Sequence, residues 1–126
     1  MFQRVPDLAS TCILACLCLI FLCLASCDKS SDNMNDCGGT TPTYTADIKP
    51  ILDASCAKSG CHDAITMQNG VNLSTYATAS VISQQERFLG VIEHRAGFPQ
   101  MPFDGPKLPD HQIQLLNCWV EGGSPE

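Results

Sequence analysis

The chain has 126 residues, with 7 Lys and Arg against 13 Asp and Glu, and a formal net charge of −6. This acidic balance argues against binding to nucleic acid or directly to anionic lipid, because both need clustered basic side chains. The length suits one small domain, whose modest core often needs a covalent staple.

The chain opens with a short polar start, followed by an apolar run from Cys12 to Ala25. The run is shorter than the roughly 20 residues of a membrane-spanning helix, so it predicts a secretory signal instead. It ends in Leu-Ala-Ser-Cys at residues 24–27, which resembles a bacterial lipoprotein lipobox. The resemblance implies a signal peptide over residues 1–26 and a diacylated Cys27 that anchors the protein to a membrane, facing the periplasm or cell surface. An ordinary signal peptide is the alternative.

The nine cysteines divide into groups. Four lie in the signal: Cys12, Cys16, Cys18 and Cys23. Of the other five, Cys27 is assigned to the lipid, and Cys56 and Cys61 belong to a motif described below. This leaves Cys37 and Cys118 as a possible disulfide, because disulfides persist in exported proteins. Two unrelated thiols are the alternative.

Residues 27–43 are predicted to form a flexible linker, because polar residues and a Gly-Gly-Thr-Thr-Pro stretch are typical of loops. The folded domain is then expected over residues 44–126. Apolar side chains recur at helical spacing between Tyr44 and Leu52, which predicts a first helix with Thr45 as its N-cap. This helix is expected to run into a loop at Cys56.

Two short helices are predicted in the middle of the domain. Ser74 is expected to cap a helix that continues through Ala77. Further on, Ser83 and Glu86 have the spacing of a capping box, in which each side chain satisfies the backbone of the other residue. An apolar stripe of Phe88, Leu89 and Ile92 follows, as expected for an amphipathic helix.

The last helix has the clearest boundaries. Asp110 is expected to cap its start, Trp119 lies on its apolar face, and Gly122 is expected to end it. No stretch of the chain alternates between apolar and polar residues for long enough to suggest a sheet. The predicted fold class is therefore all-α.

Residues 56–62, with the sequence Cys-Ala-Lys-Ser-Gly-Cys-His, point most directly to function. Two cysteines with a histidine after the second are typical of c-type haem attachment, in which thiols add to haem vinyl groups and the imidazole binds the iron. The usual spacing is two residues, whereas this chain has four, and Gly60 gives the loop freedom to bulge. The alternatives are a Cys56–Cys61 disulfide and a zinc site that adds His62 and Cys118 to these cysteines.

A proline-rich loop over residues 98–109 contains four prolines and Met101. Prolines restrict φ and lower the entropy of the unfolded loop, so this loop is expected to be stiff. A stiffly held thioether suits a sixth iron ligand, because methionine sulfur is a known axial ligand of haem. His94 is the main rival for that position, and His111 is a weaker one. A purely space-filling Met101 is also possible.

In their order, these features resemble small bacterial class I cytochrome c domains. The likeness covers nearly all of residues 44–123. It includes Asp-Ile-Lys-Pro-Ile-Leu at residues 47–52 before the Cys-His motif, the Met101-Pro102 pair, and a final helix with Trp119. The resemblance implies an all-α domain wrapped around one haem, with the first and last helices packed together. It also places Tyr44 and Trp119 near this helix contact or the haem edge.

The resemblance further implies one covalent haem c per chain. Two thioether anchors and two axial iron ligands are expected, in this order: Cys56, Cys61, His62 and Met101. The expected function is that of a membrane-anchored monohaem cytochrome, which carries electrons between redox protein partners and is not itself an enzyme. The alternative is a haem-free, disulfide-stapled lipoprotein that acts as a binding or assembly module.

Overall fold

The structure is a computed structural model and describes residues 36–126, which lie within one compact unit. The expected signal peptide and Cys27 lie outside the described residues. Within 36–126 there are helices and no strands, which confirms the all-α prediction. None of the helices described there is long and apolar enough to cross a membrane.

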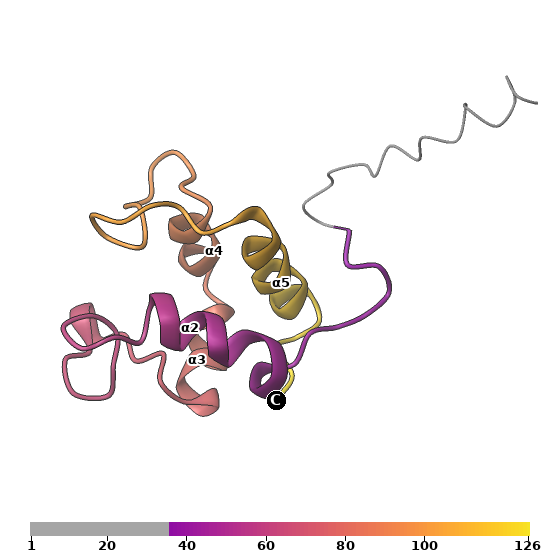
Figure 1. The fold of residues 1–126 in the computed structure, drawn as a ribbon, viewed down its shortest axis with the longest axis horizontal. Coiled ribbons are helices and arrows are strands. Elements are labelled where there is room, and N and C mark those ends of the chain that lie inside the picture. Colours follow the sequence, from indigo (N-terminus) through magenta and orange to yellow (C-terminus); the bar gives the residue numbers. More distant parts are fainter. Residues whose placement is uncertain (1–35) are drawn as a thin grey trace, which may run out of the picture. The chain divides into compact units, whose positions relative to one another are not determined.

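The helices are short, and Figure 1 labels the four α-helices. In chain order the elements are the π-helix η1 (Tyr44–Ile48), α2 (Lys49–Ser55), the 3-10 turn η2 (Gln68–Gly70), α3 (Tyr76–Ser83), α4 (Glu86–Ile92) and α5 (Asp110–Glu121). The first helical segment packs against the last, and α4 packs against both α3 and α5. The chain's C-terminus lies beside η1 (Figure 1), where Tyr44 N donates to Pro125 O at 3.0 Å.

The first helix begins two residues earlier than expected, because Thr43 and not Thr45 is the N-cap. The backbone of Thr43 is extended, its hydroxyl accepts from Ala46 N, and Asp47 Oδ2 accepts from Thr43 N at 2.8 Å. These reciprocal contacts resemble a capping box. The π-helical turn that follows lies just before Pro50, whose ring would clash with the carbonyl four residues earlier in a regular α-helix.

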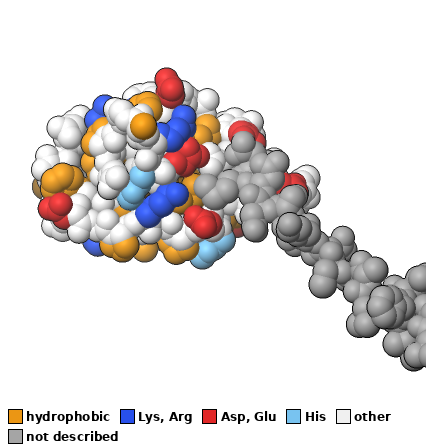
Figure 2. Space-filling model, turned by 90° about the horizontal axis from the view of Figure 1, so that it is seen from above, with side chains coloured by type: hydrophobic (Ala, Val, Ile, Leu, Met, Phe, Trp, Pro, Cys, Tyr) orange, Lys and Arg blue, Asp and Glu red, His pale blue; other side chains and the backbone are white. Residues whose placement is uncertain are grey.

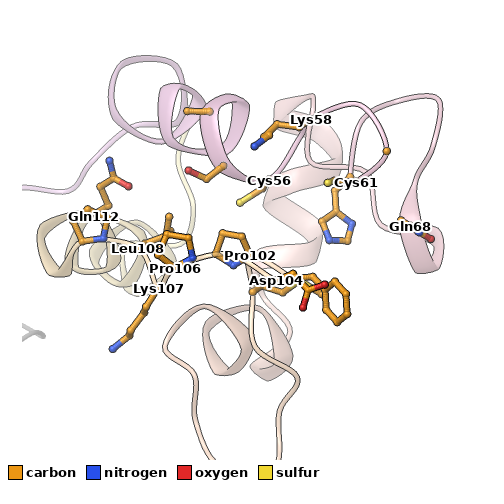
Figure 3. Close-up of a pocket in the computed structure, with 18 of the residues that line it drawn as sticks. Cys56, Lys58, Cys61, Gln68, Pro102, Asp104, Pro106, Lys107, Leu108 and Gln112 are labelled. Atoms are coloured by element: carbon orange, nitrogen blue, oxygen red, sulfur yellow. The ribbon is translucent and has the colours of Figure 1, made fainter.

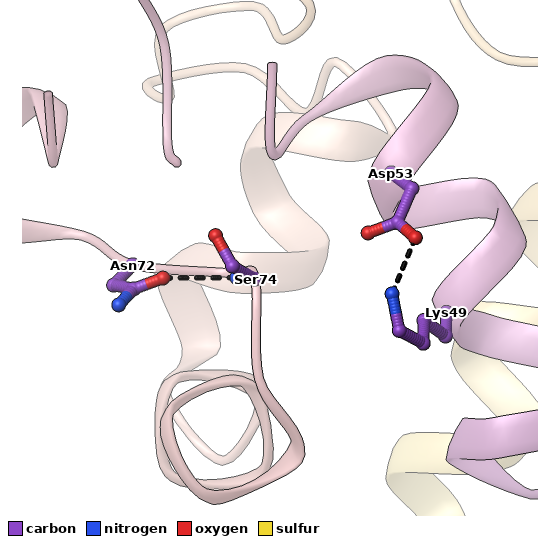
Figure 4. A network of polar contacts seen from close by, with 4 residues as sticks. All are labelled: Lys49, Asp53, Asn72 and Ser74. Carbon is purple, nitrogen blue, oxygen red and sulfur yellow. Dashed lines mark hydrogen bonds and ion pairs between the residues drawn. The ribbon is translucent and has the colours of Figure 1, made fainter. Parts of the chain in front are cut away.

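The cap of α3 also differs by one residue from the prediction. Thr75 is the N-cap and its hydroxyl accepts from Thr78 N, whereas Ser74 lies in the turn before the helix. Asn72 Oδ1 accepts from Ser74 N at 2.9 Å in this turn (Figure 4). Figure 4 also shows the ion pair between Lys49 and Asp53, one helical turn apart on α2.

The capping box expected at Ser83 does not form. Ser83 is the buried last residue of α3, and Gln85 is the N-cap of α4 without a side-chain bond. The Ser83 hydroxyl donates to Ser80 O at 2.8 Å and lies 2.7 Å from Ser124 Oγ. The prediction was wrong because tertiary burial gives this hydroxyl partners other than the next helix.

The last helix follows its predicted bounds closely. Its N-cap is Pro109 without a side-chain bond, so Asp110 is its first residue and does not cap it. The carboxylate still lies in the first turn, where the helix dipole favours a negative charge. Gly122 ends the helix as predicted. A Cβ on Gly122 would lie 2.2 Å from Thr41 Cγ2, so this close approach requires a glycine.

One core holds the elements together. It is formed by apolar side chains from every α-helix, from η1 and from the loops before α3 and α5: Tyr44, Ile48, Ile51, Leu52, Leu73, Ala79, Phe88, Ile92, Leu108, Ile113, Leu116 and Trp119. The Tyr44 and Trp119 rings lie 6.1 Å apart between centroids, at the contact of η1 with α5. This matches the packing of first and last helices that the cytochrome resemblance implies.

A Cys37–Cys118 disulfide joins the start of the described chain to α5, with an S–S distance of 2.04 Å. Nearby, Gln114 Nε2 donates to Asp36 O at 2.7 Å. Residues 36–43, which the sequence assigns to the linker, are therefore attached to the last helix. Because Cys118 is bridged, it is not available as the fourth ligand of the alternative zinc site.

Acidic and basic side chains are interspersed on the face seen in Figure 2, without a large area of one sign. The ion pairs that can be described are local. Lys49 pairs with Asp53, and Arg95 pairs with Glu93 at 2.6 Å. Surface charge on this face thus gives no reason to expect a strongly basic docking site.

Candidate functional site

A pocket of about 900 Å³ lies between the loop after α2 and the proline-rich loop before α5. Figure 3 shows Cys56 and Cys61 on one side of it and Pro102 and Pro106 on the other. The volume lies within the roughly 300 to 1,000 Å³ typical of small-molecule and cofactor sites. All four predicted haem contacts line this one pocket: Cys56, Cys61, His62 and Met101.

The loop that contains the two cysteines is closed by backbone hydrogen bonds. Cys56 directly follows α2, and its carbonyl accepts from His62 N at 3.1 Å. Within the loop, Cys61 N donates to Lys58 O at 2.9 Å. Gly60 has a φ of +82°, in the left-handed region that favours glycine. The four intervening residues therefore bulge outward while the ends of the motif stay together.

His62 is held by its backbone and not by its ring. Its carbonyl accepts from Leu73 N at 2.9 Å. Its ring Nδ1 is buried and makes no hydrogen bond with the described residues. Because Nδ1 is buried, it is not the atom that would meet a ligand in the pocket. A bound iron would take the other ring nitrogen, Nε2.

The thiols of Cys56 and Cys61 are both free, so the alternative Cys56–Cys61 disulfide is not formed in this structure. Burial, and to a lesser extent the neighbouring Cys61, raise the pKa of Cys56 to about 11. The Cys56 thiol is therefore protonated at neutral pH.

Met101 is fixed to the end of α4 through its backbone. Its N–H donates to Val91 O at 3.0 Å, and its carbonyl lies 3.0 Å from Nε2 of His94. The Met101 residue lines the pocket, whereas His94 and the exposed His111 do not. Among the residues considered for the sixth ligand, the structure therefore brings only Met101 to the pocket.

The charges around the pocket differ from those of the chain as a whole. Its charged lining residues are Lys58, Lys107 and Asp104, two cations and one anion, in a chain of net charge −6. A local excess of positive charge favours a ligand that carries carboxylates. Haem has propionate carboxylates, so the lining charges fit this cofactor.

Sequence reasoning missed several lining residues, namely Gln68, Asn69, Leu108 and Gln112. Only Leu108 could have been recognised from the sequence, because it is an apolar residue among the prolines of this loop. The structure shows that its side chain is buried. The described residues contain no group of three or more His, Cys, Asp or Glu that could hold a metal ion. A haem iron needs no such group, because the porphyrin supplies its equatorial ligands and the protein supplies axial ones.

The aromatic pair at the helix contact is separate from the pocket. Tyr44 and Trp119 lie where η1 meets α5, and neither lines the pocket. Of the two positions that the cytochrome resemblance implies for these side chains, the structure therefore shows the helix contact.

Comparisons with known protein families, curated protein sequences and solved structures give no match for this chain. The resemblance to class I cytochrome c domains thus stays a prediction from the order of the sequence motifs. The functional argument rests on this chain's own residues and on the pocket that they share.

Proposed function

We propose that this chain is a monohaem c-type cytochrome, exported as a lipid-anchored protein, that carries electrons between redox protein partners. One observation carries the proposal. The residues of a Cys…Cys-His motif and a methionine 39 positions beyond the histidine (101 − 62) line the same pocket. Such a convergence of two distant segments is what covalent attachment and axial ligation together require.

Each residue has a distinct role in this proposal. Cys56 and Cys61 would form the thioether links, and His62 and Met101 would be the iron ligands. A bound haem supplies a one-electron ferrous/ferric couple. The chain's own contribution is to hold the backbones of His62 and Met101 and to line the pocket with Pro102, Pro106 and Leu108.

The proposed ligand pair has an electronic consequence. A Met/His ligand pair raises a haem reduction potential. We therefore expect a potential on the high side for a c-type haem. The acidic balance of the chain is compatible with a redox partner that presents a basic surface.

The test is expression of the chain together with a c-type haem maturation system. We expect a Soret band and a covalent haem stain that survives denaturing electrophoresis. A double variant, Cys56→Ser with Cys61→Ser, should lose the stain. The matched control, Cys37→Ser with Cys118→Ser, removes two other cysteines and should keep the stain per molecule of protein. The stain is read against the protein amount, because loss of the bridge also lowers the stability of the control.

Two results would contradict the proposal. One is covalent haem that persists in the Cys56→Ser, Cys61→Ser variant. The other is wild-type protein that folds in the maturation strain without any haem. The second result would favour the alternative of a haem-free lipoprotein that acts as a binding or assembly module.

A further inference from the structure

We infer that His94 is a positioning residue, which holds the backbone of Met101 so that this residue stays at the pocket. This inference deepens the proposed function and rests on it for the role of Met101 as an iron ligand. The contact itself, between His94 Nε2 and Met101 O, is independent of any haem.

Residues at the end of α4 make hydrogen bonds with both the N–H and the carbonyl of Met101. Val91, in the last turn of α4, accepts the Met101 N–H at 3.0 Å. His94, two residues after the helix, reaches the Met101 carbonyl at 3.0 Å. With both groups held, the peptide unit on each side of Met101 is fixed relative to α4.

The direction of the second hydrogen bond follows from its chemistry. A carbonyl oxygen only accepts, so Nε2 of His94 carries the proton and donates. The ring nitrogen that makes this bond is not free to bind iron. His94 is half-buried and does not line the pocket, so it acts through Met101.

The backbone of His94 belongs to the C-terminal end of α4. Its φ is +60°, in the left-handed region, and Arg95 N donates to Gly90 O at 3.0 Å, as in a Schellman motif that ends a helix. Here the turn after α4 directs the imidazole back toward the proline-rich loop.

Methionine is a weak axial ligand that depends on its loop for placement, whereas His62 is fixed within the attachment motif. We therefore expect loss of the His94 contact to affect the Met101 side of the site alone. Removal of one such hydrogen bond should raise the population of loop-open states roughly 2- to 10-fold.

The first readout uses the haem-loaded protein with three variants. His94→Ala should weaken the long-wavelength absorption band of methionine-ligated ferric haem and lower the reduction potential, with the covalent haem stain unchanged. His94→Gln should restore both, because its amide can donate to the Met101 carbonyl. The control His111→Ala changes an exposed histidine on α5 and should leave both unchanged.

The second readout uses protein with no haem and needs no maturation system. Hydrogen exchange at the Met101 amide should speed up roughly 2- to 10-fold in His94→Ala and return toward the wild-type rate in His94→Gln. An unchanged Met101 amide in His94→Ala would overturn the inference. Faster exchange with no covalent haem in any variant would support the anchoring contact and refute the proposed function. A haem spectrum that shows His94 itself as the ligand would overturn the inference.

Discussion

Removal of the Cys37–Cys118 disulfide should destabilise the domain strongly. The bridge joins residues 81 positions apart and so encloses most of the described chain. The loop-entropy relation gives about 4.5 kcal/mol at 25 °C for a loop of that length, and measured values are typically about 2 to 4 kcal/mol. The bridge also holds Asp36 beside Gln114 and keeps residues 36–43 against α5. A loss of at least about 2 kcal/mol is therefore expected.

The assay is urea unfolding of a double variant, Cys37→Ala with Cys118→Ala, against the wild type. The single variant Cys37→Ala is the matched control, because it breaks the bridge but keeps the buried Cys118 side chain in place. Thiol labelling of the denatured, unreduced wild type should find neither cysteine reactive. A free-energy change below about 0.5 kcal/mol, or two labelled thiols, would refute the reasoning.

Four further outcomes are expected. Met101→Ala should abolish the methionine band and lower the reduction potential while covalent haem stays attached, and an unchanged spectrum would remove Met101 from the site. Gly122→Ala should cost about 1 to 3 kcal/mol in urea unfolding, because its Cβ would lie 2.2 Å from Thr41 Cγ2. Thr41→Ser removes that atom and should recover part of the loss. The pKa of Cys56 is raised from 9.0 to about 11, so the folded haem-free protein favours the protonated thiol and should lose stability as the pH rises from 9 to 11. A Cys56→Ala variant should lack that slope. Intact mass spectrometry of the exported protein should show acyl chains on Cys27, and Cys27→Ser should lack them.

Four of the residues that line the pocket could be singled out from the sequence, and the others could not. Cys56, Cys61 and His62 are close in sequence, so their proximity follows from the chain itself. Met101 could be added because prolines on both sides indicate a stiff loop. The proposed role of His94 could not be found this way. Its partner is a backbone carbonyl, which every residue has, so the contact requires no particular residue type at position 101.

Helix existence was easier to predict than helix caps. Several neighbouring Ser and Thr residues could each serve as the N-cap of a helix. The one that does so is the residue whose backbone is extended at that point. Thr43 and Thr75 cap their helices because both have β-region dihedral angles. Ser83 fails as a cap because it is buried against Ser124, which lies 41 residues away in the chain. Such long-range partners are not visible in a local pattern.

The Cys37–Cys118 bond turns most of the domain into a closed covalent ring. Both loops that line the pocket lie inside this ring, the first after α2 and the second before α5. One cut by a protease in either loop therefore opens the ring but releases no fragment, and the Cys…Cys-His segment stays tethered to the Met101 segment. A nicked molecule would separate into two pieces only after reduction. In the exported protein proposed above, a single cleavage by a protease would therefore leave both pocket segments covalently joined.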